Sequence, residues 1–299
     1  MVGLRGVRVV HGSLVAIVAP ASGFDRDDLF RGLAWLSTRY RLRIESHTLE
    51  RSGYLAGADA VRGGVLSRAM LDPSVDAIFC ARGGYGAMRI LDALPWDTFA
   101  LRPKPIVGFS DVTALHLAAN LRGIPSVHGP NVTGLGRVIA PAERASLIAA
   151  VEGLPLAPWT GLTVLVPGEA EGIVVGGNLA LVEAMAAAGR LVVPPAAILV
   201  LEDVMERPYR IDRMLTALRL GGHLARAGAI VLGGFTQCDA GPDGTTVLHV
   251  LADRTADLGI PVVMGAPFGH GKSNHAFPLG RRAALRRGGR LEWLSTFST

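Results

Sequence analysis

The chain has 299 residues, of which 49% are hydrophobic and 18% charged, a composition that supplies apolar cores for two domains. No run of about 18 apolar residues occurs in it, which argues against a membrane-spanning helix. The net charge of +5 comes without a recognisable nucleic-acid-binding module, so we expect neither nucleic acid nor a membrane as a partner.

The N-terminal segment predicts a first buried strand at 14–20 and a helix from about Asp25. Early arginines and the Ala19-Pro20-Ala21 sequence are also features of a secretory signal. The apolar run is short, however, and His11-Gly12-Ser13 interrupts the apolar stretch before it. We therefore expect a cytoplasmic protein.

Short apolar runs alternate with helix-like segments along both halves of the chain. The expected strands are 14–20, 76–84, 104–110, 196–204, 228–235 and 260–267, and the alternation restarts in the second half with the undivided segment 172–189. The expected helices are 25–40, 59–72, 87–94, 111–123, 210–222 and 246–259. Strands rich in Val and Ile that alternate with helices indicate mainly parallel α/β sheets.

The alternating pattern weakens between 138 and 167, where proline, glycine and alanine are frequent. We therefore expect an N-terminal α/β domain at 1–140, an interdomain linker at 141–167 and a C-terminal domain at 168–299. Near the C-terminus, Gly288-Gly289 separates two arginine-rich segments of strand length and predicts a β-hairpin.

Ser110 follows an apolar strand and precedes a helix, in the sequence Gly108-Phe109-Ser110-Asp111-Val112. Nucleophilic serines favour such a sharp strand-to-helix turn. The first glycine of the G-x-S-x-G elbow is present and the last is not. From these residues alone, Ser110 is either a nucleophile or the N-cap of the helix that begins at Asp111.

The segment 81–86, Ala-Arg-Gly-Gly-Tyr-Gly, also follows an expected strand. Consecutive glycines allow backbone N–H groups to bind an anion or a developing oxyanion. The spacing fits neither a Walker loop nor a dinucleotide fingerprint. An ordinary glycine turn is the alternative.

Glu202 stands at the end of a strongly apolar strand, where a carboxylate needs a partner. Asp203 and Glu206 are its rivals. His270 lies in a loop rich in glycine and proline, the kind of segment that often carries catalytic residues, and His275 competes with it.

A metal site is not expected, because the chain has no H-E-x-x-H motif and no cysteine cluster. His270 and His275 are five residues apart in a loop, which is a poor zinc signal. Cys80 and Cys238 are far apart and fit small core residues better than a disulfide framework. We expect no cofactor.

Five segments, taken together and in this order, resemble the signature segments of the serine LD-carboxypeptidases, the muramoyltetrapeptide carboxypeptidases of bacterial cell-wall recycling. They are 80–91, 104–117, 172–182, 199–215 and 268–280. The resemblance extends from about Leu14 to the C-terminus.

The resemblance implies a Ser-Glu-His triad of Ser110, Glu202 and His270, in place of the rival carboxylates and His275. It also implies an N-terminal α/β domain with a mainly parallel sheet and a smaller C-terminal α/β domain with a mixed or barrel-like sheet. The active site would lie in the groove between them, and the protein would be a homodimer.

For the reaction, the resemblance implies release of the terminal D-alanine from meso-diaminopimelate in a muropeptide tetrapeptide. The oxyanion would meet the N–H of Asp111 and one N–H from Gly83 or Gly84. Arg82 and Tyr85 are expected to contact the substrate. Two alternatives stay open, a microcin C immunity peptidase that cleaves a peptidyl-nucleotide and a muropeptide-binding protein without catalysis.

Overall fold

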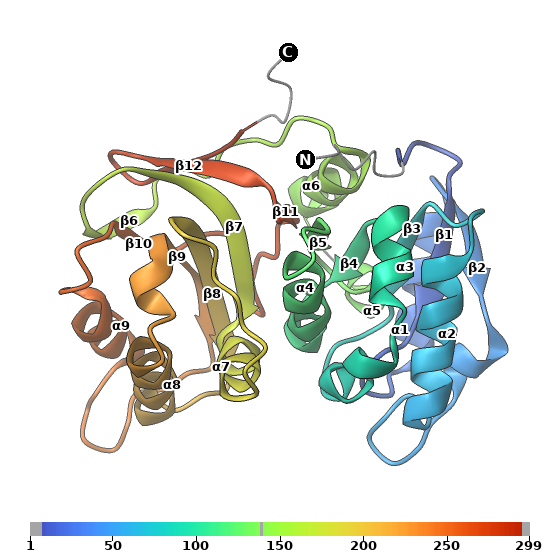
Figure 1. Cartoon of the computed structure of the whole chain (residues 1–299), viewed down its shortest axis with the longest axis horizontal. Coiled ribbons are helices and arrows are strands. Elements are labelled where there is room, and N and C mark those ends of the chain that lie inside the picture. Colours follow the sequence, from blue (N-terminus) through green and yellow to red (C-terminus); the bar gives the residue numbers. More distant parts are fainter. Residues whose placement is uncertain (1–7, 138–139, 295–299) are drawn as a thin grey trace. The chain divides into compact units, whose positions relative to one another are not determined.

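The chain divides into two compact α/β units, as expected from the sequence (Figure 1). The computed structural model describes residues 8–137 and 140–294. One unit consists of Met1–Leu154 with His275–Pro278, and the other of Pro155–Asn274 with Leu279–Thr299. The C-terminal half of the chain thus returns one short segment to the N-terminal unit.

The N-terminal unit is built on a sheet whose described strands follow the order β11-β5-β4-β3-β1-β2. The strands are β1 (Leu14–Val18), β2 (Arg41–Ile44), β3 (Ala77–Cys80), β4 (Ile106–Gly108), β5 (Ser126–His128) and β11 (Phe277–Leu279). The neighbours from β2 to β5 pair in parallel. Strands β3 and β4 are buried throughout, as is typical of a parallel sheet with both faces covered, so the predicted mainly parallel sheet is confirmed in this unit.

Helices lie between these parallel strands and after β5 along the chain. They are α1 (Arg26–Ser37), α2 (Asp59–Leu71), α3 (Trp96–Leu101), α4 (Thr113–Asn120), α5 (Val132–Leu135) and α6 (Pro141–Glu152), with 3-10 turns η1 (Ser46–Leu49), η2 (Ala87–Ala93) and η3 (Ser110–Val112). The predicted start of the first helix is confirmed, because the Asp25 side chain accepts a hydrogen bond from the Asp28 N–H and caps α1.

The C-terminal unit contains a mixed sheet whose described strands follow the order β13-β12-β7-β8-β9-β10-β6. They are β6 (Thr163–Val166), β7 (Ala170–Asn178), β8 (Ala197–Val204), β9 (Ala227–Thr236), β10 (Val262–Met264), β12 (Arg282–Arg286) and β13 (Arg290–Trp293). The helices are α7 (Leu179–Ala187), α8 (Pro208–Leu220) and α9 (Val247–Thr255), with the 3-10 turn η4 (Leu224–Arg226). Strands β7 to β10 are parallel, whereas β6 and β12 run antiparallel to their neighbours.

This sheet curls until its two edges meet. Trp159 forms a bridge with Leu291 of β13, and the Leu162 N–H donates to the Gly289 carbonyl at 3.1 Å. The chain then continues directly into the opposite edge strand, β6. The expected mixed or barrel-like sheet is therefore confirmed, as is the hairpin at Gly288-Gly289, which joins the antiparallel strands β12 and β13.

The segment 141–167 differs from the linker that the sequence suggested. Its first part is α6, whose Leu147 and Val151 pack into the core of the N-terminal unit. Its last part is β6, which pairs with β10 in the other unit. The connection between α6 and β6 is therefore only 153–162. The alanine-rich stretch that the sequence analysis assigned to the linker is a helix with a narrow apolar face.

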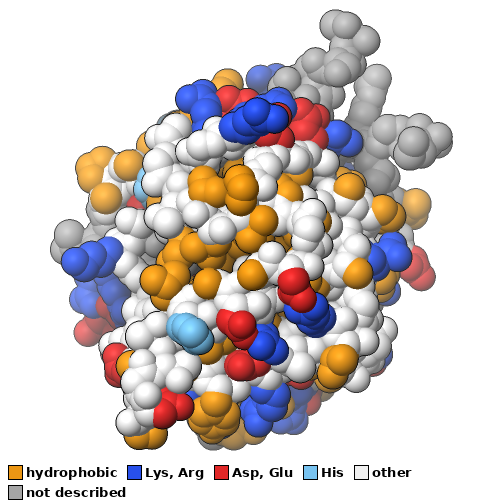
Figure 2. Space-filling view, turned by 90° about the vertical axis from the view of Figure 1, so that its left-hand side faces the viewer, with side chains coloured by type: hydrophobic (Ala, Val, Ile, Leu, Met, Phe, Trp, Pro, Cys, Tyr) orange, Lys and Arg blue, Asp and Glu red, His pale blue; other side chains and the backbone are white. Residues whose placement is uncertain are grey.

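One face of the C-terminal unit carries apolar side chains over its middle, with charged side chains around them (Figure 2). A hollow on this unit is lined by Val164, Val166 and Val263 beside the Arg286–Gly289 turn. In the described part of the chain, none of the helices has the length and apolar character needed to cross a membrane.

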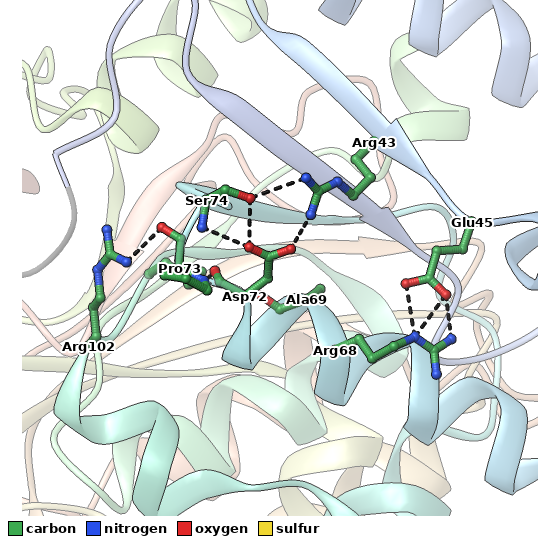
Figure 3. Close-up of polar contacts among 9 residues, drawn as sticks. Arg43, Glu45, Arg68, Ala69, Asp72, Pro73, Ser74 and Arg102 are labelled. Carbon is green, nitrogen blue, oxygen red and sulfur yellow. Dashed lines mark hydrogen bonds and ion pairs between the residues drawn. The ribbon is translucent and has the colours of Figure 1, made fainter.

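Polar contacts fasten the edge strand β2 to α2 and to the turn before β3 (Figure 3). Arg43 pairs with Asp72 and donates to the Ser74 hydroxyl at 3.1 Å, and Arg68 forms a forked pair with Glu45. The neighbouring Ser74 and Arg43 lower the pKa of Asp72 to about 2. These charges are paired with one another, so we interpret the cluster as structural and not as a binding site. It covers the edge of the sheet at β2.

Gly32 allows α1 to approach α5, and its replacement by alanine should destabilise the protein. A Cβ at Gly32 would lie 1.9 Å from the Val132 carbonyl oxygen. We expect Gly32→Ala to cost about 1–3 kcal/mol of unfolding free energy, measured by urea denaturation.

Gly64→Ala in α2 is the matched control. A Cβ there would approach only the flexible Arg68 side chain, at 3.4 Å. This variant should gain up to about 1 kcal/mol, because alanine favours a helix interior over glycine. Equal effects of the two substitutions would rule out close helix packing at Gly32.

Candidate active site

Ser110 has a left-handed backbone conformation at the end of β4, with φ of +66°. For a residue with a Cβ this conformation costs roughly 1–2 kcal/mol, and such strain is found at functional sites and in nucleophile elbows. The N-cap alternative is wrong, because Phe109 is the N-cap residue of η3 and no side-chain cap bond is made there.

Three hydrogen bonds hold the two residues before Ser110. The carbonyl of Gly108 accepts from His116 Nε2 at 2.9 Å and from the Gly129 N–H at 3.1 Å. Asn131 Oδ1 accepts from the Phe109 N–H at 3.3 Å. The strained turn is thus fixed by partners from α4 and from the segment after β5.

His116 is fully buried, and burial lowers its pKa to about 4 although the Gly108 carbonyl favours the protonated ring. At neutral pH the ring is therefore uncharged. Because Nε2 faces a carbonyl oxygen, Nε2 must carry the hydrogen and Nδ1 must not.

The predicted glycine loop lies against Ser110. A Cβ at Gly83 would lie 2.7 Å from the Ser110 Cβ and 3.1 Å from the Phe109 carbonyl oxygen. On the other side, the Gly83 carbonyl accepts from the Ser22 N–H at 3.2 Å, and the Tyr85 N–H donates to Ser22 Oγ at 3.0 Å. Only glycine fits at position 83, so the ordinary-turn alternative does not explain this close approach.

The side chains of Asp111 and Arg62, to which the sequence analysis gave no role, also hold this loop. Asp111 Oδ2 accepts from the Ala87 N–H at 2.7 Å, and burial raises the pKa of this carboxyl group. The Arg62 guanidinium donates to the carbonyls of Gly86 at 2.9 Å and Gly57 at 3.1 Å. The available signal for Arg62 was its place on the buried face of α2, where an arginine needs several acceptors.

Within the described residues, the N–H groups of Gly83 and Gly84 donate no hydrogen bond to a backbone carbonyl. They belong to a loop that is fixed by other contacts. Two backbone donors held in this way are suited to bind an anion or a developing oxyanion.

Glu202 and His270 form a pair in the C-terminal unit. Glu202 is fully buried near the end of β8, and its Oε2 lies 2.7 Å from His270 Nδ1. A Cβ at Gly269 would lie 2.8 Å from Glu202 Oε2, so the glycine before His270 permits the close approach. The Gly269 N–H donates to Asn274 Oδ1 at 3.1 Å and fixes the loop. A carboxylate on Nδ1 fixes the tautomer in which Nδ1 carries the hydrogen, so Nε2 is the basic nitrogen of the ring.

The rival residues have other partners. Asp203 accepts from Asn178 Nδ2 and from the Ala180 N–H, both at 3.0 Å, and burial raises its pKa to about 6. Glu206 pairs with Arg210 on α8, and His275 belongs to the N-terminal unit. Neither rival carboxylate makes the contact with His270 that Glu202 makes, and His275 lies in the other unit from Glu202.

The two expected substrate contacts lie within the glycine loop, on either side of Gly83 and Gly84. Arg82 Nη1 donates to the Gly23 carbonyl at 2.7 Å, and the exposed guanidinium keeps further donors. Tyr85 is exposed, and its ring centroid lies 5.9 Å from that of Tyr54. Within the described residues, no group of three His, Cys, Asp or Glu side chains is arranged to hold a metal ion.

Comparison with known proteins gives a consistent result over nearly the whole chain. Residues 15–129 match the LD-carboxypeptidase N-terminal domain, and residues 171–285 match the LD-carboxypeptidase C-terminal domain. The murein tetrapeptide carboxypeptidase of Pseudomonas aeruginosa is 35% identical over 292 residues, which cover 93% of this chain and 94% of that protein.

Solved structures show the same fold. The muramoyltetrapeptide carboxypeptidase of Oxalobacter formigenes has a TM-score of 0.84 and 29% identity, and the match covers 93% of this chain and 97% of that chain. The microcin C7 self-immunity protein MccF has a TM-score of 0.88 over 98% of this chain and 99% of its own. Its identity is 20%, so this likeness concerns the fold alone.

Acid should weaken the protein through His116. The folded protein keeps this ring neutral down to about pH 4, whereas the unfolded chain takes up a proton below its ordinary pKa of 6.5. Stability is therefore lost as the pH falls from 6.5 to about 4, by up to about 3 kcal/mol.

His116→Gln tests this effect, because a glutamine Nε2 still donates to the Gly108 carbonyl and does not titrate. Urea unfolding at pH 7 and pH 4.5 should show a smaller loss of stability for this variant than for the wild type. His249→Gln, on the exposed surface of α9, is the control and should behave as the wild type. Parallel losses in all three proteins would contradict the role of His116.

Proposed function

Since the chain belongs to the LD-carboxypeptidase family, we propose that it releases the terminal D-alanine from muropeptide tetrapeptides by a Ser-Glu-His mechanism. The bond to be hydrolysed joins the L-centre of meso-diaminopimelate to D-alanine. The observation that carries the proposal is the 2.7 Å contact between buried Glu202 and His270, which orients an imidazole base.

In the proposed reaction, Ser110 Oγ attacks the carbonyl carbon while His270 Nε2 takes the hydroxyl proton. His270 then gives this proton to the leaving amine of D-alanine, and an acyl-enzyme remains. Water attacks the acyl-enzyme, again with His270 as the base, and restores Ser110. Glu202 holds the ring and stabilises the imidazolium through Nδ1. The left-handed turn at Ser110 supports its role as the nucleophile.

Charge that develops on the carbonyl oxygen would be met by the N–H of Asp111 and an N–H of Gly83 or Gly84. One such donor contributes about 3–4 kcal/mol in the transition state. The Asp111 carboxylate and Arg62 support this assignment, since they fix the loop before any substrate binds. Arg82 would contact the free carboxylate of D-alanine, because its exposed guanidinium retains free donor positions next to that loop.

The substrate class is supported by the relatives, whose names give murein tetrapeptide and muramoyltetrapeptide as what they act on. In such substrates the peptide is joined to a muramic acid sugar. We also propose that the protein takes part in peptidoglycan recycling, is located in the cytoplasm and forms a homodimer. The likeness to MccF concerns the fold alone, so it does not favour a peptidyl-nucleotide as the substrate. The oriented Glu202–His270 pair argues against the other alternative, a protein that binds muropeptide without catalysis.

Release of D-alanine from purified muropeptide tetrapeptide tests the proposal. The wild type should release it, and Ser110→Ala should lower kcat by at least about 10⁴-fold, because the nucleophile is lost. Glu202→Gln should cost about 10⁴-fold with the fold intact, because it favours the wrong histidine tautomer. Ser37→Ala, at the exposed end of α1, is the matched control and should retain full activity.

Two results would overturn the proposal. Substantial release of D-alanine by Ser110→Ala would show that Ser110 is not the nucleophile. No release by the wild type, together with cleavage of a peptidyl-adenylate, would assign the protein to the other substrate class.

A further inference from the structure

Two tyrosines form an exposed aromatic surface beside the glycine loop. Tyr54 is 65% exposed and Tyr85 is 49% exposed, although both are large rings. Their ring centroids are 5.9 Å apart and the planes are tilted by 56°. Neighbouring aromatic rings left open to solvent in this way are typical of binding surfaces. We call Tyr54 and Tyr85 the tyrosine platform.

The platform is fixed by backbone contacts. The Tyr54 carbonyl accepts from the Gly23 N–H at 3.0 Å, and the Tyr85 N–H donates to Ser22 Oγ at 3.0 Å. Ser22 also forms a bridge with Leu55, the residue after Tyr54. Because Ser22 and Gly23 hold the backbone of both tyrosines, the two residues keep a fixed spacing, which lowers the entropic cost of binding.

An ion pair borders the platform. Arg89 Nη2 lies 2.9 Å from Asp59 Oδ2, and both side chains are about two-fifths exposed. Asp59 also pairs with Arg62, whose guanidinium donates to the carbonyl of Gly86, the residue after Tyr85, at 2.9 Å. The platform thus combines apolar ring faces with planar donors and acceptors at its rim.

We propose that the tyrosine platform is a saccharide subsite that binds the sugar at the amino-terminal end of the peptide substrate. Pyranose rings pack their C–H groups on aromatic faces and offer hydroxyl and acetamido groups to side chains such as Arg89 and Asp59. A planar base held between two rings would need them parallel and about 7 Å apart, whereas these rings are tilted and closer. The arrangement fits a puckered ring better.

The position of the platform agrees with this assignment, which rests on the proposed function. In a tetrapeptide that loses its last residue, three residues separate the sugar from the scissile bond, a span of roughly 10–11 Å when extended. Gly83 contacts Ser110, and Tyr85 is two residues further, at most about 7 Å along the chain. Tyr54 lies one ring spacing beyond, 5.9 Å from Tyr85. The path from Gly83 to the tyrosine rings is thus of the same order as the span from the scissile bond to the sugar.

Binding to the inactive Ser110→Ala protein tests the subsite without turnover. The probes are a disaccharide-tetrapeptide and the same tetrapeptide without sugar, with Kd measured by calorimetry. We expect the sugar to improve the affinity about tenfold. Adding Tyr54→Ala should reduce this preference to about twofold or less, whereas Tyr54→Phe should keep it, because the ring face makes the contact.

Tyr209→Ala is the matched control, since Tyr209 is also 65% exposed but lies on α8 of the other unit. It should leave the tenfold preference unchanged. Equal affinity for the two probes, or a preference that survives Tyr54→Ala, would overturn the subsite. A larger Tyr54-dependent gain from a peptidyl-adenylate than from the disaccharide would also overturn it, in favour of a nucleobase.

The same two probes, given to the wild type, separate the subsite from the catalytic proposal. D-alanine release with no preference in binding would keep the peptidase and reject the subsite. Tyr54-dependent sugar binding without any D-alanine release would keep the subsite and reject the peptidase.

Discussion

The left-handed backbone at Ser110 is the constraint around which the N-terminal unit is arranged. A non-glycine residue in this conformation is unfavourable by roughly 1–2 kcal/mol, so the surroundings must impose it. They do so through His116 and Gly129 on the Gly108 carbonyl, Asn131 on the Phe109 N–H and the close contact with Gly83. The same contacts that impose the turn place the glycine loop beside the serine hydroxyl. Strain and preorganisation are therefore two consequences of one packing arrangement.

The C-terminal unit meets a different constraint, the burial of a carboxylate. Near the end of the apolar strand β8, Glu202 is fully removed from water, and such a group is costly unless it is partnered. His270 is its partner, and Gly269 permits the approach. Each unit thus holds one group of the proposed site in a fixed geometry. The N-terminal unit has the strained serine beside the Gly83 and Gly84 amide donors, and the C-terminal unit has the oriented imidazole. We propose that these parts act together in an acyl-enzyme peptidase.

Much of this could be predicted from the sequence, because strand ends, glycine positions and family segments are local signals. Ser110, Glu202 and His270 each follow an apolar run or stand between glycines. The supporting contacts were not predictable in the same way. The Asp111 carboxylate reaches a residue 24 positions away, and Asn131 reaches across 22, so only the folded chain brings them together. The linker was placed too widely for a similar reason, since helix α6 is defined by its packing and not by strong periodicity.

The most direct test of the central claim, that His270 activates the residue at position 110, is the pKa of a thiol placed there. The rate of iodoacetamide alkylation of Ser110→Cys would be followed against pH, with peptide mapping to separate Cys80 and Cys238. We expect an apparent thiol pKa below about 7.5, because a neighbouring imidazolium stabilises the thiolate, and a return toward about 8.5 when His270→Ala is added. The same thiol pKa in both variants would contradict the claim.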